Sequence, residues 1–207
     1  MAPDQGQPLR ELLFSHSQFG EDMLLRSLTR DRPFGFYVDV GAHHPFYYSN
    51  TFHFYSKGWR GINIDAVPGS MKPFLQLRPR DVNLEACVGM PGRWVEFSIF
   101  EEQTLNTMDA GVALKLVQQN RSRLVGKQKF QTQSLAQILE RHMPSGQTID
   151  FLSVDVEGAD LEVLQSNDWP CFDRSSSSPR VMVASFKRST RSQSQAFWQA
   201  TAMIRSL

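Results

Sequence analysis

Two aspartates stand at the ends of short apolar runs that have the composition of buried strands. Asp39 lies in the run Phe36–Val40, which Gly41 closes, and Asp65 ends the run Gly61–Asp65. A glycine at such a strand end lets the backbone pass close beneath a ligand. A carboxylate in the place of Asp65 can accept both hydroxyls of a ribose, and Asp39 offers an acceptor for a cationic group. Together they predict an adenosine site, although Asp39 alone could cap a neighbouring turn.

The glycine pattern bears on which adenosine compound would fit. Dinucleotide-binding loops use G-x-G-x-x-G to cradle a pyrophosphate, but here the run is Gly41-Ala-His-His-Pro-Phe46. One glycine and a proline argue against a nicotinamide-dependent oxidoreductase and against a P-loop. S-adenosylmethionine has no phosphate, so one glycine is enough, and its sulfonium charge suits an acid-rich pocket. We expect this cofactor to be held by Asp39, Gly41, Ala42, Asn50, Asp65 and Ala66.

A third apolar run, Ile149–Asp155, brings in two candidate catalytic carboxylates. Asp155 ends the run, and Glu157 follows just before Gly158. Attack on a sulfonium methyl is an in-line displacement, so positioning supplies much of the rate. A carboxylate here could also take a hydroxyl proton as general base. Glu157 could instead cap the helix that begins at Gly158, and Asp155 could be purely structural.

Two adjacent histidines follow the first predicted strand. His43 is our third catalytic candidate, since it or His44 could act as a base or contact the acceptor. The alternative is that one ring packs and the other is solvated. Phe46, Tyr47 and Tyr48 could line a substrate pocket, although core packing of at least one is the simpler interpretation. No His, Cys, Asp or Glu cluster has the spacing of a metal site, so no metal is expected.

Strand patterns alternate with helix patterns, which predicts βαβ units and a mostly parallel α/β sheet. Buried strands are expected over 36–40, 61–65, 82–88, 149–155 and 180–184, a brief strand over 130–132, and an antiparallel or edge strand over 94–100. Helices are expected from Ser17 to Leu28, over 50–57, from Pro68, and over 110–120, 134–142, 159–164 and 196–204. The acids Glu21 and Asp22 could cap the first of these helices.

The composition fits one globular domain: 207 residues, 41% hydrophobic and 21% charged. A net charge of +1 gives no argument for a nucleic-acid or membrane partner. Cys87 and Cys171 form no CxxC pair and are expected to be reduced thiols. Residues 1–13 lack the apolar core of a signal peptide, and no apolar run approaches the roughly 18 residues that span a bilayer. We therefore expect a cytoplasmic protein.

Several segments resemble the FkbM-type S-adenosylmethionine-dependent methyltransferases: Asp39–His43, Ser49–Thr51, Gly58–Asp65 and Ile149–Gly158. Ser17–Asp22 fits the same pattern, so the resemblance runs from about Ser17 to Trp169. It implies that Gln18, Glu21 and Asp22 could lie over the cofactor pocket, although helix capping by the two acids explains them equally well. Its most specific part is Val154-Asp-Val-Glu-Gly158 followed by Glu162-Val-Leu164. The resemblance implies a Rossmann-like class I methyltransferase sheet and O-methylation of a hydroxyl. The implied partner is a small hydroxylated acceptor, such as a sugar or a secondary metabolite.

The C-terminal segment departs from the family pattern. Ala184–Phe186 stands where relatives usually carry a glutamate, and residues 174–207 hold six basic and no acidic side chains. No strand pattern remains for the final antiparallel pair of a class I sheet. We therefore divide the chain into an N-terminal extension (1–16), a methyltransferase core (17–173) and a divergent or truncated segment (174–207). An uncovered sheet edge would favour self-association, and a catalytically inactive, cofactor-binding or structural relative is the alternative function.

Overall fold

The computed structural model describes residues 14–29, 32–102, 105–156, 158–169, 182–188 and 198–204. Six helices lie in this part of the chain: α1 (Glu21–Thr29), α2 (Phe52–Ser56), α3 (Met71–Leu77), α4 (Ala110–Gln118), α5 (Leu135–His142) and α6 (Asp160–Gln165). The strands are β1 (Phe36–Val40), β2 (Arg60–Asp65), β3 (Val82–Glu85), β4 (Trp94–Phe100), β5 (Leu124–Gln131), β6 (Phe151–Val154), β7 (Met182–Arg188) and β8 (Trp198–Ile204).

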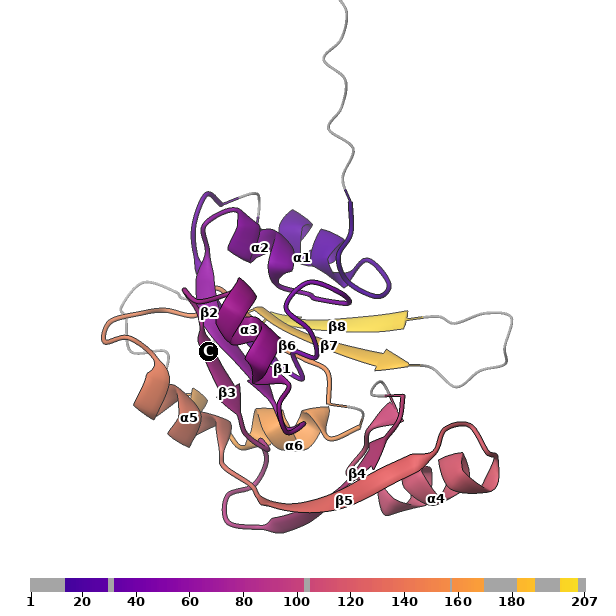
Figure 1. Ribbon diagram of the computed structural model, residues 1–207. Helices are drawn as coiled ribbons and strands as arrows, with labels where there is room; N and C mark the ends of the chain where they lie inside the picture. Colours follow the sequence, from indigo (N-terminus) through magenta and orange to yellow (C-terminus); the bar gives the residue numbers. More distant parts are fainter. Residues whose placement is uncertain are drawn as a thin grey trace, which may run out of the picture.

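A six-stranded sheet in the order β3-β2-β1-β6-β7-β8 forms the centre of the fold (Figure 1). The pairs from β3 to β7 are all parallel, and only β8 runs antiparallel to its neighbour. The predicted α/β fold with a mostly parallel sheet is thus confirmed. The chain first builds outward from β1 to β2 and β3, and later returns to β6 on the other side of β1. Such a reversal of strand order is where open α/β sheets bind ligands.

Helices cover both faces of this sheet, which is why every residue of β1 is buried. Val38 points to one face, where it packs in a cluster with Leu139 of α5 and Val163 of α6. Tyr37 points to the other face and packs with Leu25 of α1 and with α2. The alternation of side chains along a strand therefore sends Asp39, two residues after Tyr37, to the face of α1 and α2.

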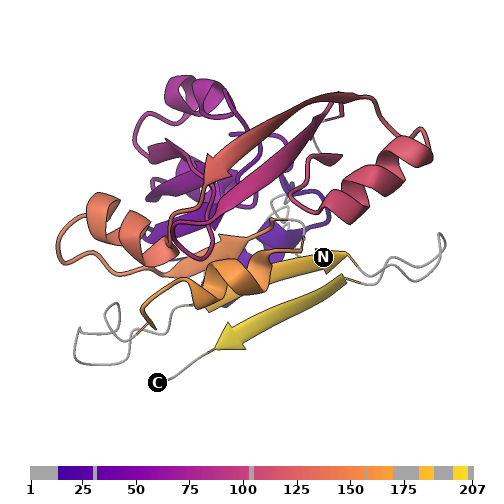
Figure 2. The same ribbon diagram turned by 90° about the horizontal axis from the view of Figure 1, so that it is seen from below.

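Strands β4 and β5 form a separate antiparallel pair with α4 between them in the sequence. Figure 1 shows this pair reaching away from the central sheet, and Figure 2 shows α4 lying beside it. The antiparallel strand predicted over 94–100 is confirmed. We refer to residues 94–131 as the β4–β5 unit.

The prediction for the last element was wrong. We expected a helix over 196–204, but Trp198–Ile204 is strand β8, paired with β7 from Met182↔Ile204 to Arg188↔Trp198. The unpaired edge of β7 offers backbone partners that override a weak local preference for helix. The sheet therefore does not end at the 180–184 strand as expected, because an antiparallel strand follows and covers that edge. The argument for self-association from an uncovered β7 edge loses its basis.

Smaller differences concern where elements begin and end. The helix expected from Pro68 begins at Met71, the strand expected over 82–88 ends at Glu85, and the brief strand at 130–132 is the end of the longer β5. Within the described residues, no helix is long and apolar enough to cross a membrane.

Candidate functional site

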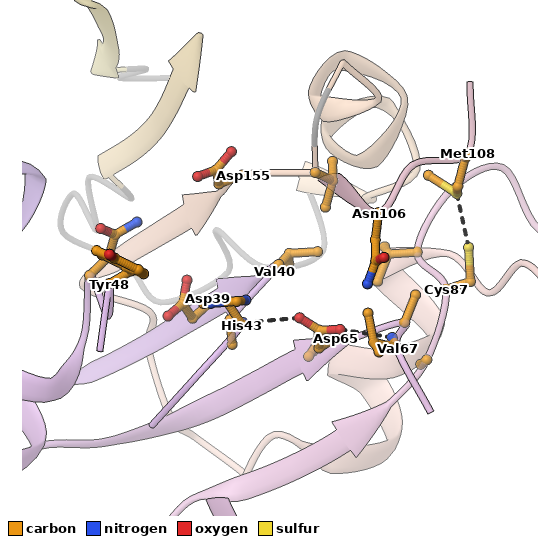
Figure 3. A pocket seen from close by; sticks show the side chains of 18 of the residues that line it. Asp39, Val40, His43, Tyr48, Asp65, Val67, Cys87, Asn106, Met108 and Asp155 are labelled. Atoms are coloured by element: carbon orange, nitrogen blue, oxygen red, sulfur yellow. Dashed lines mark hydrogen bonds between the residues drawn. The ribbon is translucent and has the colours of Figure 1, made fainter. Parts of the chain in front are cut away.

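A pocket lies at the carboxyl ends of β1, β2 and β6 (Figure 3). Its wall includes nearly every residue that we singled out from the sequence: Asp39, Gly41, Ala42, His43, Asn50, Asp65, Ala66 and Asp155. Glu157 lies outside the described residues. Residues far apart in the chain meet here because parallel strands gather their carboxyl ends at one edge. Their functional roles stay predictions.

Gly41 is required by the close approach of two strand ends. Its φ angle is +86°, and a Cβ built on it would lie 1.9 Å from the carbonyl oxygen of Asp155. The Gly41 amide donates to the carbonyl of Ile64 at 2.9 Å, and the Asp155 amide donates to the carbonyl of Val40 at 2.9 Å. These bonds hold the ends of β1, β2 and β6 against one another, so the floor of the pocket has no room for a side chain at position 41.

Asp65 anchors the loop that follows β1. One carboxylate oxygen accepts the amide of His43 at 2.9 Å, and the other accepts the amide of Val67 at 2.8 Å. Burial raises the pKa of Asp65, and these two amides oppose the shift because they stabilise the charged form. A carboxylate oxygen has two lone pairs. Asp65 therefore keeps acceptor capacity for ligand hydroxyls after it has bound both amides.

Asp39 is held from below the pocket. Its carboxylate accepts a hydrogen bond from the Thr51 hydroxyl at 2.9 Å. Burial raises the pKa of Asp39, whereas the positive charge of Arg78 acts to lower it. Beside it, the Asn50 amide donates to the Ser153 hydroxyl at 3.1 Å, which fixes another residue of the pocket wall.

Arg78 is a fully buried cation that the sequence analysis did not predict. Its Nε donates to Asp81 at 2.9 Å, and its Nη atoms donate to Thr51 at 3.0 Å and to the Tyr37 hydroxyl at 2.5 Å. The Tyr37 hydroxyl donates in turn to Asp81 at 2.7 Å. This network connects α3, β1 and the start of α2 directly beneath Asp39. In the sequence, Leu77-Arg-Pro-Arg80 has the composition of an exposed loop, so no pattern indicated it.

The opposite side of the pocket is largely apolar and was also missed. It comes from the segments after β2 and β3 and from the β4–β5 unit: Val67, Ala86, Cys87, Val88, Phe97, Asn106, Thr107 and Met108. The Cys87 sulfur lies 3.4 Å from that of Met108, and burial raises the pKa of the Cys87 thiol to about 11. Cys87 is therefore a protonated packing residue at neutral pH. Apolar residues like these are indistinguishable from core residues in a single sequence.

Residues 39–195 match the family model of the methyltransferase FkbM domain, which covers most of the chain. The chain belongs to this family. The resemblance seen in the sequence is thereby confirmed, and family membership points to methyl transfer. No curated protein and no solved structure matches.

The two histidines of this FkbM domain have different surroundings. His43 lines the pocket, and burial lowers its pKa, so its ring is neutral at pH 7. His44 has a structural role, since its Nδ1 accepts hydrogen bonds from the backbone amides of Phe46 at 3.1 Å and Tyr47 at 3.0 Å. Among the aromatic candidates, Tyr48 reaches the pocket wall. His43 therefore remains a candidate base, and His44 shapes the turn beside it.

Of the three candidate residues in the segment before β1, two reach the pocket wall and one does not. Gln18 and Glu21 line the pocket. Asp22 is fully buried and accepts hydrogen bonds from the His16 amide at 2.8 Å and the Ser17 hydroxyl at 2.7 Å. Asp22 thus fixes the start of α1, which holds Glu21 at the pocket. Within the described residues, no group of three or more His, Cys, Asp or Glu side chains could hold a metal ion.

Proposed function

We propose that this FkbM domain is an S-adenosylmethionine-dependent methyltransferase acting on a hydroxyl of a sugar or other small metabolite. The observation that carries the proposal is the meeting of Asp39, Asp65 and Asp155 in one pocket at the ends of three neighbouring strands. The reversal of strand order beside β1 supports a Rossmann-like class I sheet. Membership of a methyltransferase family supports the reaction type.

The residues of the pocket fit this cofactor. Asp65 retains lone pairs for ribose hydroxyls, and Asp39 offers negative charge to the cationic end of the molecule. Ala86 and Val88 give an apolar surface next to Asp65 that suits a nucleobase. When bound, the cofactor would supply an activated methyl group on its sulfonium sulfur. Transfer would form the carbon–oxygen bond to the acceptor and break the carbon–sulfur bond, with the neutral thioether as leaving group.

The acceptor hydroxyl must lose its proton in this reaction. Two side chains of the pocket can receive it: the Asp155 carboxylate at the end of β6, and the neutral imidazole of His43. We assign the proton to Asp155 and a contact with the acceptor to His43. Hydrogen bonds fix the backbone at Gly41 and Asp155, which limits where that carboxylate can lie, and positioning supplies much of the rate in a displacement of this kind.

The test has two stages. Titration calorimetry with S-adenosylhomocysteine measures cofactor binding, and mass spectrometry with methyl-labelled S-adenosylmethionine and a panel of hydroxylated acceptors measures transfer. Binding followed by a labelled methyl ether supports the proposal. Binding without transfer supports an inactive relative, which the replacement of the usual glutamate by Ala184–Phe186 favours. A protein that binds no adenosyl compound contradicts both the proposed enzyme and an inactive relative that binds the cofactor.

A further inference from the structure

Asn106 is a buried polar residue in the pocket wall, contributed by the β4–β5 unit. Its Oδ1 accepts the backbone amide of Phe100 at 2.7 Å. Because an amide N–H must face an oxygen, this bond fixes which way the Asn106 side chain is turned. Its Nδ2 group then faces away from Phe100, and it has no hydrogen-bond partner among the described residues.

A buried donor without an acceptor is unusual in a folded protein and calls for an explanation. In Figure 3 the Asn106 nitrogen points toward the side of the pocket where Asp65 and Val67 lie. Cys87 and Met108 complete this part of the wall with apolar surface. The surroundings therefore combine an amide NH2 group that has no acceptor among the described residues with apolar packing surfaces, directly beyond the carboxylate assigned to the ribose.

We propose that Asn106 Nδ2 donates a hydrogen bond to a ring nitrogen of the adenine, which makes Asn106 a specificity-determining residue for the cofactor. The assignment rests on the proposed function. Adenine supplies what this part of the pocket lacks: unprotonated ring nitrogens in its plane as acceptors, and two flat apolar faces for Val67, Cys87 and Met108. The bond satisfies one of the two Nδ2 hydrogens of Asn106, both of which lack an acceptor among the described residues.

The same bond links the β4–β5 unit to the cofactor. Thr107, next to Asn106, exchanges two backbone hydrogen bonds with Ser98 of β4, at 2.9 and 3.2 Å. A ligand held by Asn106 on one side and Asp65 on the other therefore connects this two-stranded unit to the central sheet. S-adenosylhomocysteine should slow hydrogen exchange at the amides of Ser98 and Thr107, and this effect should be lost without the Asn106 donor.

Two variants test the donor, and one serves as a control. Asn106→Asp keeps an oxygen for the Phe100 amide but lacks the donor, and Asn106→Leu lacks both. Asn167→Leu removes another buried amide without hydrogen-bond partners, away from the pocket wall. Calorimetry with S-adenosylhomocysteine should show about tenfold or greater weakening in both Asn106 variants. The Asn167 variant should bind like the wild type.

Deaza analogues of S-adenosylhomocysteine, each lacking one ring nitrogen, identify the acceptor. The wild type should bind one of the 1-, 3- and 7-deaza compounds about tenfold more weakly than the parent. Asn106→Leu should lose nothing further with that compound, because the bond is already absent. Additive losses, no loss with any analogue, or wild-type affinity in the Asn106 variants would overturn the assignment while the proposed function stands. A wild type that binds no adenosyl compound overturns the function and this assignment together.

Discussion

Replacing Gly41 by alanine should destabilise the protein far more than the same change at a glycine of similar backbone conformation. Gly41 and Gly58 both have positive φ angles, +86° and +98°. A Cβ at position 58 would meet nothing within 4 Å, whereas one at position 41 would lie 1.9 Å from the Asp155 carbonyl oxygen. The pair therefore separates the cost of backbone conformation from the cost of steric overlap.

The expected free energies follow from the structure. The left-handed conformation costs an alanine about 1–2 kcal/mol at either position. At position 41 the strand ends must also separate by about 1 Å, because interiors are too densely packed to absorb the overlap. This separation weakens the 2.9 Å bonds from Gly41 to Ile64 and from Asp155 to Val40, at about 1 kcal/mol each. Gly41→Ala should therefore lose about 3–4 kcal/mol of unfolding free energy, and Gly58→Ala about 1–2 kcal/mol.

Urea denaturation followed by circular dichroism measures both losses under the same conditions. Calorimetry with S-adenosylhomocysteine on the folded fraction adds a second measurement, since Gly41→Ala displaces the Asp155 backbone and Gly58→Ala does not touch the pocket wall. Equal losses of stability in the two variants would refute the reasoning, because the close approach of β1 and β6 would then carry no energetic weight.

Three further variants test the site and its support. Asp65→Asn should weaken S-adenosylhomocysteine binding by about 1–3 kcal/mol in calorimetry, and unchanged affinity would remove Asp65 from the site. Arg78→Met breaks a fully buried ion pair and should lower the free energy of unfolding by about 3–5 kcal/mol in urea denaturation. Arg93→Met, at a more exposed ion pair, should lower it by no more than about 1 kcal/mol. Similar losses in the two variants would contradict the idea that burial decides the contribution of the ion pair. Asp155→Asn should slow methyl transfer about 10²-fold with cofactor binding intact. If His43 is the base instead, the rate should fall only below about pH 6.5, because burial lowers its pKa, and His43→Gln should remove that acid limb of the profile.

The sequence was most informative where local pattern and topology agree. A β-branched run closed by glycine predicted β1, and the strict alternation over 94–100 predicted β4 with its observed bounds. The meeting of Asp39, Asp65 and Asp155 followed from the parallel sheet alone, since all three come at the ends of buried strands. No knowledge of side-chain contacts was needed for that prediction.

The features that could not be predicted from the sequence depend on residues that only folding brings together. Arg78 has the local sequence of a solvent-exposed basic residue, and only folding brings Tyr37 and Thr51 around it and buries it beside Asp81. Asn106 lies in the loop after β4, and its unpartnered Nδ2 group is defined by the bond of its Oδ1 to the Phe100 amide and by the pocket that it faces. Strand β8 depends on the edge of β7, which local propensity does not report.

The position of β1 between β2 and β6 has a consequence for synthesis on the ribosome. Tyr37 pairs with Gly61 on one side and with Phe151 on the other. The second partner leaves the ribosome more than a hundred residues after β1, which at usual elongation rates is roughly 6 to 22 seconds later. Until then β1 presents an unpaired apolar edge, the kind that joins other chains. The nascent protein should therefore depend on a holdase chaperone during this interval more than the finished fold does.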